Sequence, residues 1–196
     1  MNLLIKYNLV KSSIIKMLNK IKKLNYNYSE KTRFNNTIKF LKKTLPVNSK
    51  ILDIGIENRL SNRMKEEGYN VKNTNGDDLD LFPINHKTEN FDAITAFEIL
   101  EHLISPFQLL KNIKCKRLYA TVPLSLWYSK AYRNYNDIRD SHFHEFEDWQ
   151  FDWLLQKSGW KIIRKEKWIN PSFIPGIRTI LRNFSKRYYA IEAVKK

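Results

Sequence analysis

Short apolar runs alternate with amphipathic segments over most of the chain, and this alternation predicts alternating strands and helices. Apolar, β-branched and aromatic runs predict strands at 51–54, 69–74, 92–97, 116–122, 160–168 and 188–194. Apolar positions at helical spacing predict helices at 60–67, 107–113 and 147–157, and a short basic helix within 171–184. The pattern is typical of an α/β fold with a mostly parallel sheet and helices on both faces.

The first 43 residues are predicted to be helical in two pieces. Between residues 3 and 24, apolar side chains recur at helical spacing with lysines between them. The segment 25–29 is a polar break, and Ser29 or Thr32 could cap a second helix that ends near Lys43. We therefore expect a basic amphipathic helix over 1–28 and a domain over 29–196. The first helix could lie on an anionic membrane surface or pack on its own domain.

The net charge of +15 is distributed unevenly along the chain. Residues 1–50 carry +11, residues 157–196 carry +9, and residues 51–156 carry −5. Basic ends attract phosphates of lipid or nucleic acid, although the abundant lysine expected from an AT-rich genome would give the same charge. A single cysteine, Cys115, excludes a disulfide framework. No apolar run is long enough to span a membrane, so we expect a cytoplasmic protein, membrane-peripheral at most.

Carboxylates stand where two of the predicted strands end. Asp53 and Gly55 close the first strand, and Glu98 closes the strand at 92–97. Ligands of open parallel sheets bind beyond the carboxyl ends of the strands. These three residues should therefore face one crevice.

The same residues resemble a known family. Leu52-Asp-Ile-Gly55 looks like the first motif of class I S-adenosylmethionine (SAM)-dependent methyltransferases, and Phe97-Glu-Ile-Leu-Glu-His102 looks like the fourth-strand region of their small-molecule branch. The resemblance continues through Thr121-Val-Pro123, His142-Phe-His-Glu-Phe146 and Leu154-Leu-Gln-Lys-Ser-Gly-Trp160, and covers about residues 35–196. It implies a Rossmann-like sheet of six to seven strands, SAM as cofactor, and a cofactor site at Asp53, Gly55, Asn73, Asp78, Phe97 and Glu98.

The chain departs from the family pattern in two places. The turn after Gly55 has no further glycine, and Asn58 could replace one because asparagine tolerates a left-handed backbone. Residues 55–90 are too few to hold all the helices and strands that the family has between these two strands. We therefore expect a helix or a strand to be missing or shortened there. The second strand ends without an acid, and Asn73 could bond a ribose hydroxyl in its place.

Three acids follow this strand: Asp77, Asp78 and Asp80. Asp78 could contact the adenine, or the three could form a solvated loop. The three acids could also form a metal site, but their spacing alone is weak evidence for one. We therefore expect no metal. Glu101 and His102 could be ligands or could merely open a helix, where a carboxylate suits the helix dipole.

Many aromatic residues lie between Val122 and Gly159, the region that covers the acceptor in the resembled family. They could shape an apolar acceptor pocket or belong to the core. His142, His144 and Glu145 could supply a general base, or the histidines could cap the next helix. Lys130, Arg133 and Arg139 could bind an anionic acceptor.

The resemblance thus implies methyl transfer from SAM to an oxygen or carbon of a small-molecule or lipid- or glycan-linked acceptor. A catalytically degenerate binding protein of the same fold is the alternative. A nucleic-acid partner is not expected, because the Asn/Asp-Pro-Pro-aromatic motif of amino-methylating enzymes is replaced by Ala96-Phe-Glu-Ile99.

Overall fold

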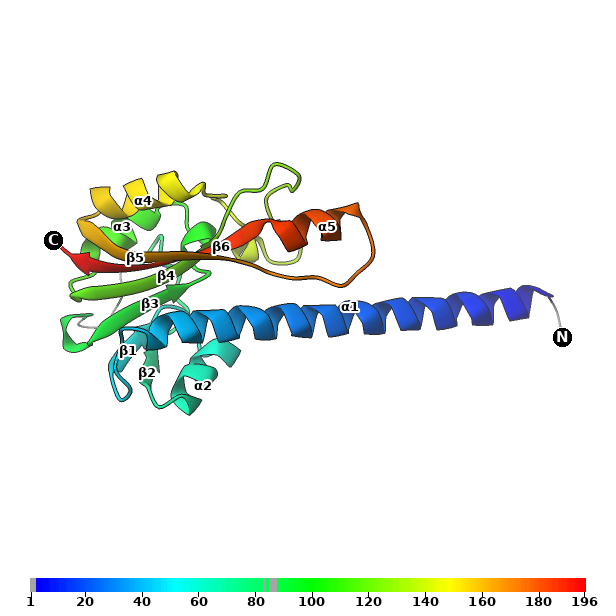
Figure 1. Cartoon of the computed structure of the whole chain (residues 1–196), viewed down its shortest axis with the longest axis horizontal. Coiled ribbons are helices and arrows are strands. Elements are labelled where there is room, and N and C mark those ends of the chain that lie inside the picture. The colour runs from blue at the N-terminus through cyan, green and yellow to red at the C-terminus, as the bar shows by residue number, and fades with distance from the viewer. Residues whose placement is uncertain (1–2, 83, 85–87) are drawn as a thin grey trace.

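A six-stranded sheet forms the centre of the molecule, in a computed structural model that describes residues 3–82, 84 and 88–196 (Figure 1). The strands are β1 (Lys50–Asp53), β2 (Asn70–Asn73), β3 (Ala93–Phe97), β4 (Arg117–Pro123), β5 (Trp160–Ile169) and β6 (Lys186–Lys195). They stand in the order β2-β1-β3-β4-β6-β5. The first four pair in parallel, and β6 runs antiparallel to both of its neighbours. The Rossmann-like, mostly parallel sheet expected from the sequence is confirmed.

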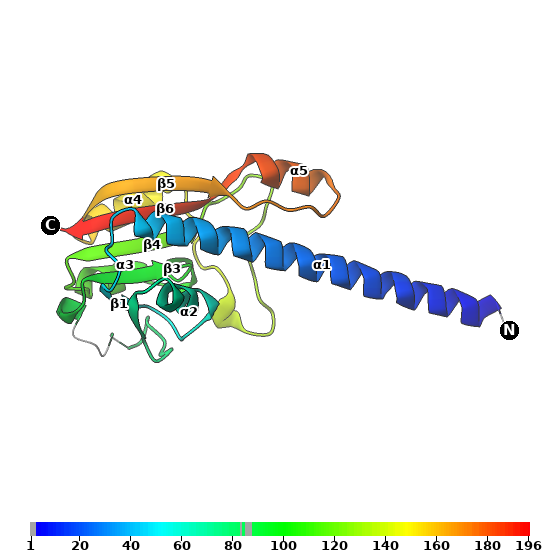
Figure 2. The ribbon, with the colours of Figure 1, turned by 60° about the horizontal axis from the view of Figure 1, so that its bottom comes forward.

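Helices cover both faces of this sheet. They are α1 (Leu3–Lys42), α2 (Arg59–Glu66), α3 (Pro106–Asn112), α4 (Asp148–Lys157) and α5 (Ile177–Phe184). In Figures 1 and 2, α1 and α2 lie on one face, α3 and α4 lie on the other, and α5 lies beyond the end of β5 and β6. Apart from the N-terminal region, each predicted strand and helix is present within one to two residues of its expected bounds, except that the last helix occupies only 177–184 of the 171–184 interval.

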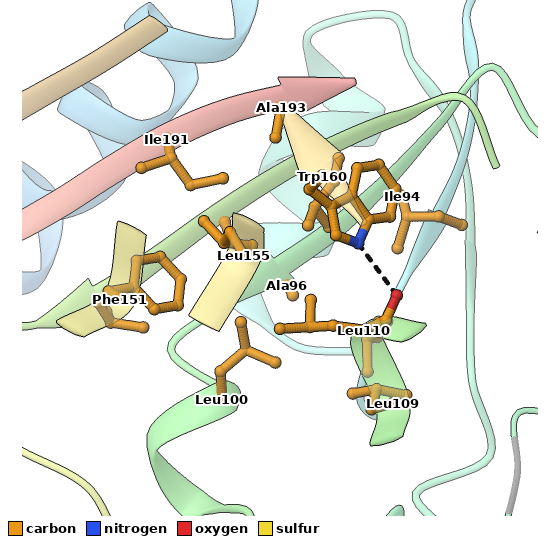
Figure 3. Packing of buried hydrophobic residues seen from close by; sticks show 14 of the residues in the cluster. Ile94, Ala96, Leu100, Leu109, Leu110, Phe151, Leu155, Trp160, Ile191 and Ala193 are labelled. Carbon is orange, nitrogen blue, oxygen red and sulfur yellow. Dashed lines mark hydrogen bonds between the residues drawn. The ribbon is translucent and has the colours of Figure 1, made fainter. Parts of the chain in front are cut away.

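The larger core lies between the sheet and the α3–α4 layer. Alternate residues of β3 and β4 point into it and meet Leu110 of α3 and Phe151 and Leu155 of α4. Trp160 at the start of β5 is fully buried there, and its indole N–H donates to the carbonyl of Leu110 at 3.0 Å (Figure 3). This bond satisfies the one polar atom of the largest core side chain.

The second core lies under α1 and α2. Phe40 and Leu41 of α1 and Met64 of α2 pack on the opposite side of β1, β3 and β4. Glu192 of β6 is buried at the margin of this core, where it pairs with Arg164 (2.9 Å) and accepts from Thr44 (2.7 Å). Strands with both faces buried read as nearly continuous apolar runs, which is the pattern seen in the sequence.

The N-terminal helix differs from its prediction. α1 runs unbroken for 40 residues through the segment 25–29, so the predicted break there is wrong, and the expected division at residue 28 falls inside the helix. Asn25 explains the continuity. It is buried, and its side-chain oxygen accepts hydrogen bonds from Ser172 (3.0 Å) and Phe173 (2.8 Å), so its polarity serves tertiary packing and not a turn.

Upstream of this contact, α1 projects beyond the domain (Figure 2). Every residue from 11 to 24 is exposed except the half-buried Ile21. Apart from Ile21, these residues do not pack on the part of the domain that the structure describes. Within the described residues, no helix combines the length and apolar character needed to cross a bilayer.

The interval between β2 and β3 has been shortened, as predicted from its length. Its described residues contain only a 3-10 turn, Thr88–Asn90, with neither a further strand nor an α-helix. β1 pairs directly with β3, with Leu52 opposite Ile94. The loop is held by Asp80, whose carboxylate accepts from the backbone N–H of Ile104 (2.8 Å) and Ser105 (2.7 Å).

Candidate functional site

The carboxyl ends of β1 and β3 open into a cavity of about 290 Å³. Its walls come from the turn after β1, the ends of β3 and β4, the start of α2 and the last third of α1. The lining residues are Glu30, Arg33, Phe34, Thr37, Asp53, Ile54, Asn58, Arg59, Leu60, Phe97, Glu98, Ile99 and Thr121. We call it the strand-end cavity. It brings Asp53, Phe97 and Glu98 together, as the sequence suggested, but the expected Gly55 and Asn73 are not among its lining residues.

Gly55 turns the chain at the edge of this cavity. Its φ of +116° is a conformation that residues with a side chain rarely adopt. A Cβ built on it would lie 3.2 Å from the terminal methyl of Ile99, which lines the cavity. The prediction that Asn58 replaces a glycine in a left-handed position is wrong. Asn58 is extended (φ −144°) and caps α2 by accepting from the N–H of Leu60 and Ser61.

Asp53 is buried at the floor of the cavity. Its two oxygens accept from Thr95 (2.6 Å) and from the side-chain amide of Asn73 (3.0 Å). Burial raises the pKa of Asp53 to about 7, although both hydrogen bonds oppose the shift. Asn73 also donates to the carbonyl of Gly55 at 3.3 Å, which leaves its own carbonyl oxygen buried without a partner in the described part of the chain.

Asp78 does not line the strand-end cavity. It lies in the loop after β2, where its carboxylate accepts from the N–H of Asp80 at 3.0 Å. Its backbone carbonyl accepts from Leu81 and Phe82. Its contacts in this structure are therefore those of a turn.

Glu98 ends β3 in a left-handed conformation, with φ +56°. Non-glycine residues rarely hold this conformation, and such strain collects at functional sites. One carboxylate oxygen accepts from Thr121 at 2.9 Å, and the other lies 3.5 Å from the guanidinium of Arg33. Burial raises the pKa of Glu98, and the charge of Arg33 opposes this.

The sequence reasoning missed the contribution of α1 to the cavity. Arg33 and Glu30 both lie on its wall, and Glu30 forms an ion pair with Arg59 of α2 across it. One signal was available in the sequence. Glu30 is the only acidic residue among the first fifty, so its place in so basic a segment called for an explanation.

Three further polar side chains gather beside Glu98. Glu101, His102 and His142 each offer a ligand atom within 4.8 Å of the others. Burial raises the pKa of Glu101 well above its usual range, and the nearby charge of Glu98 adds to the shift. Burial also lowers the pKa of His102. We call these three residues the Glu-His-His cluster.

The residues expected to supply a general base, His142, His144 and Glu145, are placed differently from one another. His142 belongs to the Glu-His-His cluster, and its Nδ1 lies 2.7 Å from a carboxylate oxygen of Glu145. His144 points elsewhere. Its Nε2 lies 3.2 Å from the carbonyl of Ile104, and its ring stacks on Phe146.

A larger cavity of about 860 Å³ lies between residues 124–145, which we call the lid segment, and α5. We call it the lid cavity. Among the described residues that line it, the cations are Lys130, Arg133, Arg178, Arg182 and Arg187, and the one acid is Glu145. The cavity is therefore strongly basic, and Glu145 connects it to the Glu-His-His cluster through His142.

The aromatic residues of the lid region do not form one apolar pocket. Tyr128 and Tyr132 line the lid cavity. Phe146 and Phe151 belong to the core, and several others are exposed: Trp127, Tyr135, Phe143, Trp149 and Trp153. Arg139 of the predicted basic group also lies outside the lining, whereas Lys130 and Arg133 belong to it.

No protein-family model and no curated protein matches the sequence. Among solved structures, the 1,6-didemethyltoxoflavin-N1-methyltransferase of Burkholderia thailandensis matches with a TM-score of 0.59. It does so at 14% identity, over 100% of this chain and 92% of its own. The magnesium protoporphyrin IX methyltransferase of Synechocystis matches with a TM-score of 0.55 at 13% identity. The match covers 90% of this chain and 87% of that enzyme.

The chain has the class I methyltransferase fold. Both of these neighbours were crystallised with S-adenosylhomocysteine bound. The cyclase SpnF also matches, with a TM-score of 0.52 at 14% identity. This match covers 83% of this chain and 80% of SpnF. Because the methyltransferase fold carries more than one reaction, the function of this chain must be argued from its own site.

Proposed function

We propose that the protein binds SAM in the strand-end cavity and transfers its methyl group to an oxygen or carbon of an anionic small molecule. The observation that carries the proposal is the cavity at the carboxyl ends of β1 and β3, beside the turn at Gly55. Parallel α/β sheets bind their ligands at this edge. The neighbours that hold S-adenosylhomocysteine support the choice of cofactor.

The charges of the cavity suit the amino-acid end of SAM. That end carries a carboxylate and an ammonium group, and Arg33 and Glu98 lie 3.5 Å apart on the wall. Arg33 would receive the carboxylate and Glu98 the ammonium. Asn73 lies next to the lining residue Asp53, and its carbonyl oxygen, which has no partner among the described residues, would accept from a ribose hydroxyl. Gly55 would let the backbone approach the cofactor, and Phe97 would close the apolar side. We assign no cofactor contact to Asp78.

Methyl transfer needs alignment more than it needs a catalytic group. The bond between sulfur and the methyl carbon breaks as the bond from the methyl carbon to the acceptor forms, and the electron pair returns to sulfur as a neutral thioether. Holding both reactants in line and excluding water supplies most of the rate. An acceptor hydroxyl must also lose its proton. We assign this proton transfer to His142, whose imidazole is held by the carboxylate of Glu145.

The charge of the lid cavity supports an anionic acceptor. Five cations against one acid among its described lining residues favour a molecule that carries phosphate or carboxylate groups. Arg182 is central to this, because its Nε is buried without a partner among the described residues. The acceptor would place its anionic group against α5 and its reacting atom toward Glu98.

Labelled methyl transfer tests the proposal. The protein is incubated with SAM that carries a labelled methyl group and with the small-molecule fraction of a cell extract. We expect label in a product that binds an anion-exchange column. Arg182→Gln should reduce transfer at least tenfold, whereas Arg63→Gln, on the exposed side of α2, should not. Bound SAM with no transfer would favour the degenerate binding protein.

A second element of the proposal concerns the exposed part of α1. Residues 11–24 present Ile14, Ile15, Met17, Leu18 and Leu24 to solvent, together with five lysines and no acid. We propose that this segment docks on an anionic bilayer, because its apolar stripe and its charge both match such a surface.

Liposome sedimentation tests the docking. Each lysine at an anionic surface contributes about 1 kcal/mol, so reversing Lys16 and Lys20 to glutamate should weaken binding at least tenfold. Reversing the exposed Lys114 and Lys116 serves as the matched control. Equal binding to neutral and anionic vesicles, or equal loss in both double variants, would contradict the docking.

A further inference from the structure

We infer that Glu101, His102 and His142 form a binding site for one divalent metal ion of the borderline class, with Zn²⁺ as its first candidate. The three ligand atoms lie within 4.8 Å of one another. Tetrahedral ligand atoms at about 2.1 Å from one zinc ion lie about 3.4 Å apart, so the side chains would have to approach one another by up to about 1.4 Å to close the site. Two imidazoles and one carboxylate form a ligand set typical of catalytic zinc.

Glu101 gives the first independent sign of a missing ligand. Its side chain is fully buried, and both carboxylate oxygens lack a hydrogen-bond partner in the described part of the chain. A buried carboxylate with no donor is costly, and proteins usually satisfy such a group with a partner or a metal. Its nearest cationic candidate is His102, whose Nε2 lies 3.9 Å from Oε1.

The outer hydrogen bonds of the two histidines give the second sign. The Nδ1 of His102 lies 3.1 Å from the carbonyl of Ser141, and the Nδ1 of His142 lies 2.7 Å from Glu145. Because a carbonyl or carboxylate can only accept, each contact makes Nδ1 the donor, and the lone pair of Nε2 can then face a metal ion. Metal-binding histidines are held in this way by a carbonyl or a carboxylate. The rings also lie close together, with centroids 4.9 Å apart.

The position of the Glu-His-His cluster suggests what the ion would do. Glu101 follows Glu98 of the strand-end cavity, and His142 reaches the lid cavity through Glu145. An ion with three protein ligands keeps an open position. This role rests on the proposed function: the open position would hold the acceptor oxygen beside the methyl group. His142 would then be a metal ligand and not the base.

Cobalt titration of the metal-free protein tests the site without any activity assay. We expect one equivalent of Co²⁺ to bind, with visible absorption bands that Zn²⁺ removes and Mg²⁺ does not. His102→Ala and His142→Ala should each weaken Co²⁺ binding at least tenfold. His144→Ala is the matched control, since that histidine lies two residues from His142 but bonds the carbonyl of Ile104. Glu101→Gln keeps the side-chain shape and should weaken binding as well.

Three results would overturn the inference. They are no Co²⁺ bands in the wild-type protein, equal binding in His102→Ala and wild type, or equal loss in His144→Ala. Circular dichroism of each variant separates loss of the site from loss of the fold. Titration of the same proteins with S-adenosylhomocysteine separates the two proposals. A protein that binds S-adenosylhomocysteine but not Co²⁺ would reject only the metal site. A protein that binds Co²⁺ but not S-adenosylhomocysteine would reject only the proposed function.

Discussion

Asp53 makes the stability of the protein depend on pH in a direction that can be worked out. Its pKa is about 7 in the fold and 3.8 in an unfolded chain, a difference of about three units. Each unit corresponds to about 1.4 kcal/mol, which sets a ceiling of about 4 kcal/mol. Between the two values the unfolded chain loses the proton while the folded protein keeps it. The free energy of unfolding should therefore fall as pH rises from about 4 to about 7, and level off above.

Asp53→Asn removes this dependence, because an amide does not titrate. The difference in free energy of unfolding between the variant and wild type should shift in favour of the variant by about 1–4 kcal/mol from about pH 5 to about pH 8. This holds whatever the stability of the variant at the lower pH. Urea unfolding followed by circular dichroism measures the difference. The exposed Asp77→Asn is the matched control and should keep the wild-type profile. Parallel profiles for Asp53→Asn and wild type would show that Asp53 ionises normally, and would refute the reasoning.

Three further predictions follow from single contacts. Gly55→Ala should weaken S-adenosylhomocysteine binding at least tenfold by calorimetry, because its Cβ meets Ile99. Gly159→Ala, at a φ of +90° with no contact closer than 4.0 Å, should lower stability without changing binding. Glu192→Ala should cost about 3–5 kcal/mol in urea unfolding, because it strips Arg164 of its buried partner; a loss below about 1 kcal/mol would contradict this. Asn58→Ala should cost about 1 kcal/mol by removing the cap of α2, and an unchanged melting temperature would argue against that role.

Local pattern was enough to predict the sheet and most of its helices. Strands buried on both faces leave apolar runs, and Gly68 and Gly159 mark the ends of α2 and α4. The shortened interval before β3 was predictable from its length alone. Its exact content was not, since the same number of residues could have held either a strand or a helix.

The failures concern residues whose role depends on distant partners. A polar run at 25–29 favours a break by local propensity, but Asn25 bonds residues 172 and 173 and the helix continues. Arg33 reaches Glu98, 65 positions away, so no local pattern could assign it to the cavity. The Glu-His-His cluster likewise joins residues forty positions apart. Glu101 and His102 were noticed in the sequence, but their grouping with His142 needs the fold.

The central claim is that the strand-end cavity binds SAM, and calorimetric titration of the wild-type protein tests it most directly. We expect one molecule of S-adenosylmethionine, or of S-adenosylhomocysteine, to bind per chain, with Arg33→Ala weakening binding at least tenfold. Arg63→Ala on the outer side of α2 should bind as wild type does. No heat of binding for either compound up to millimolar concentration, in protein whose fold is verified by circular dichroism, would contradict the account.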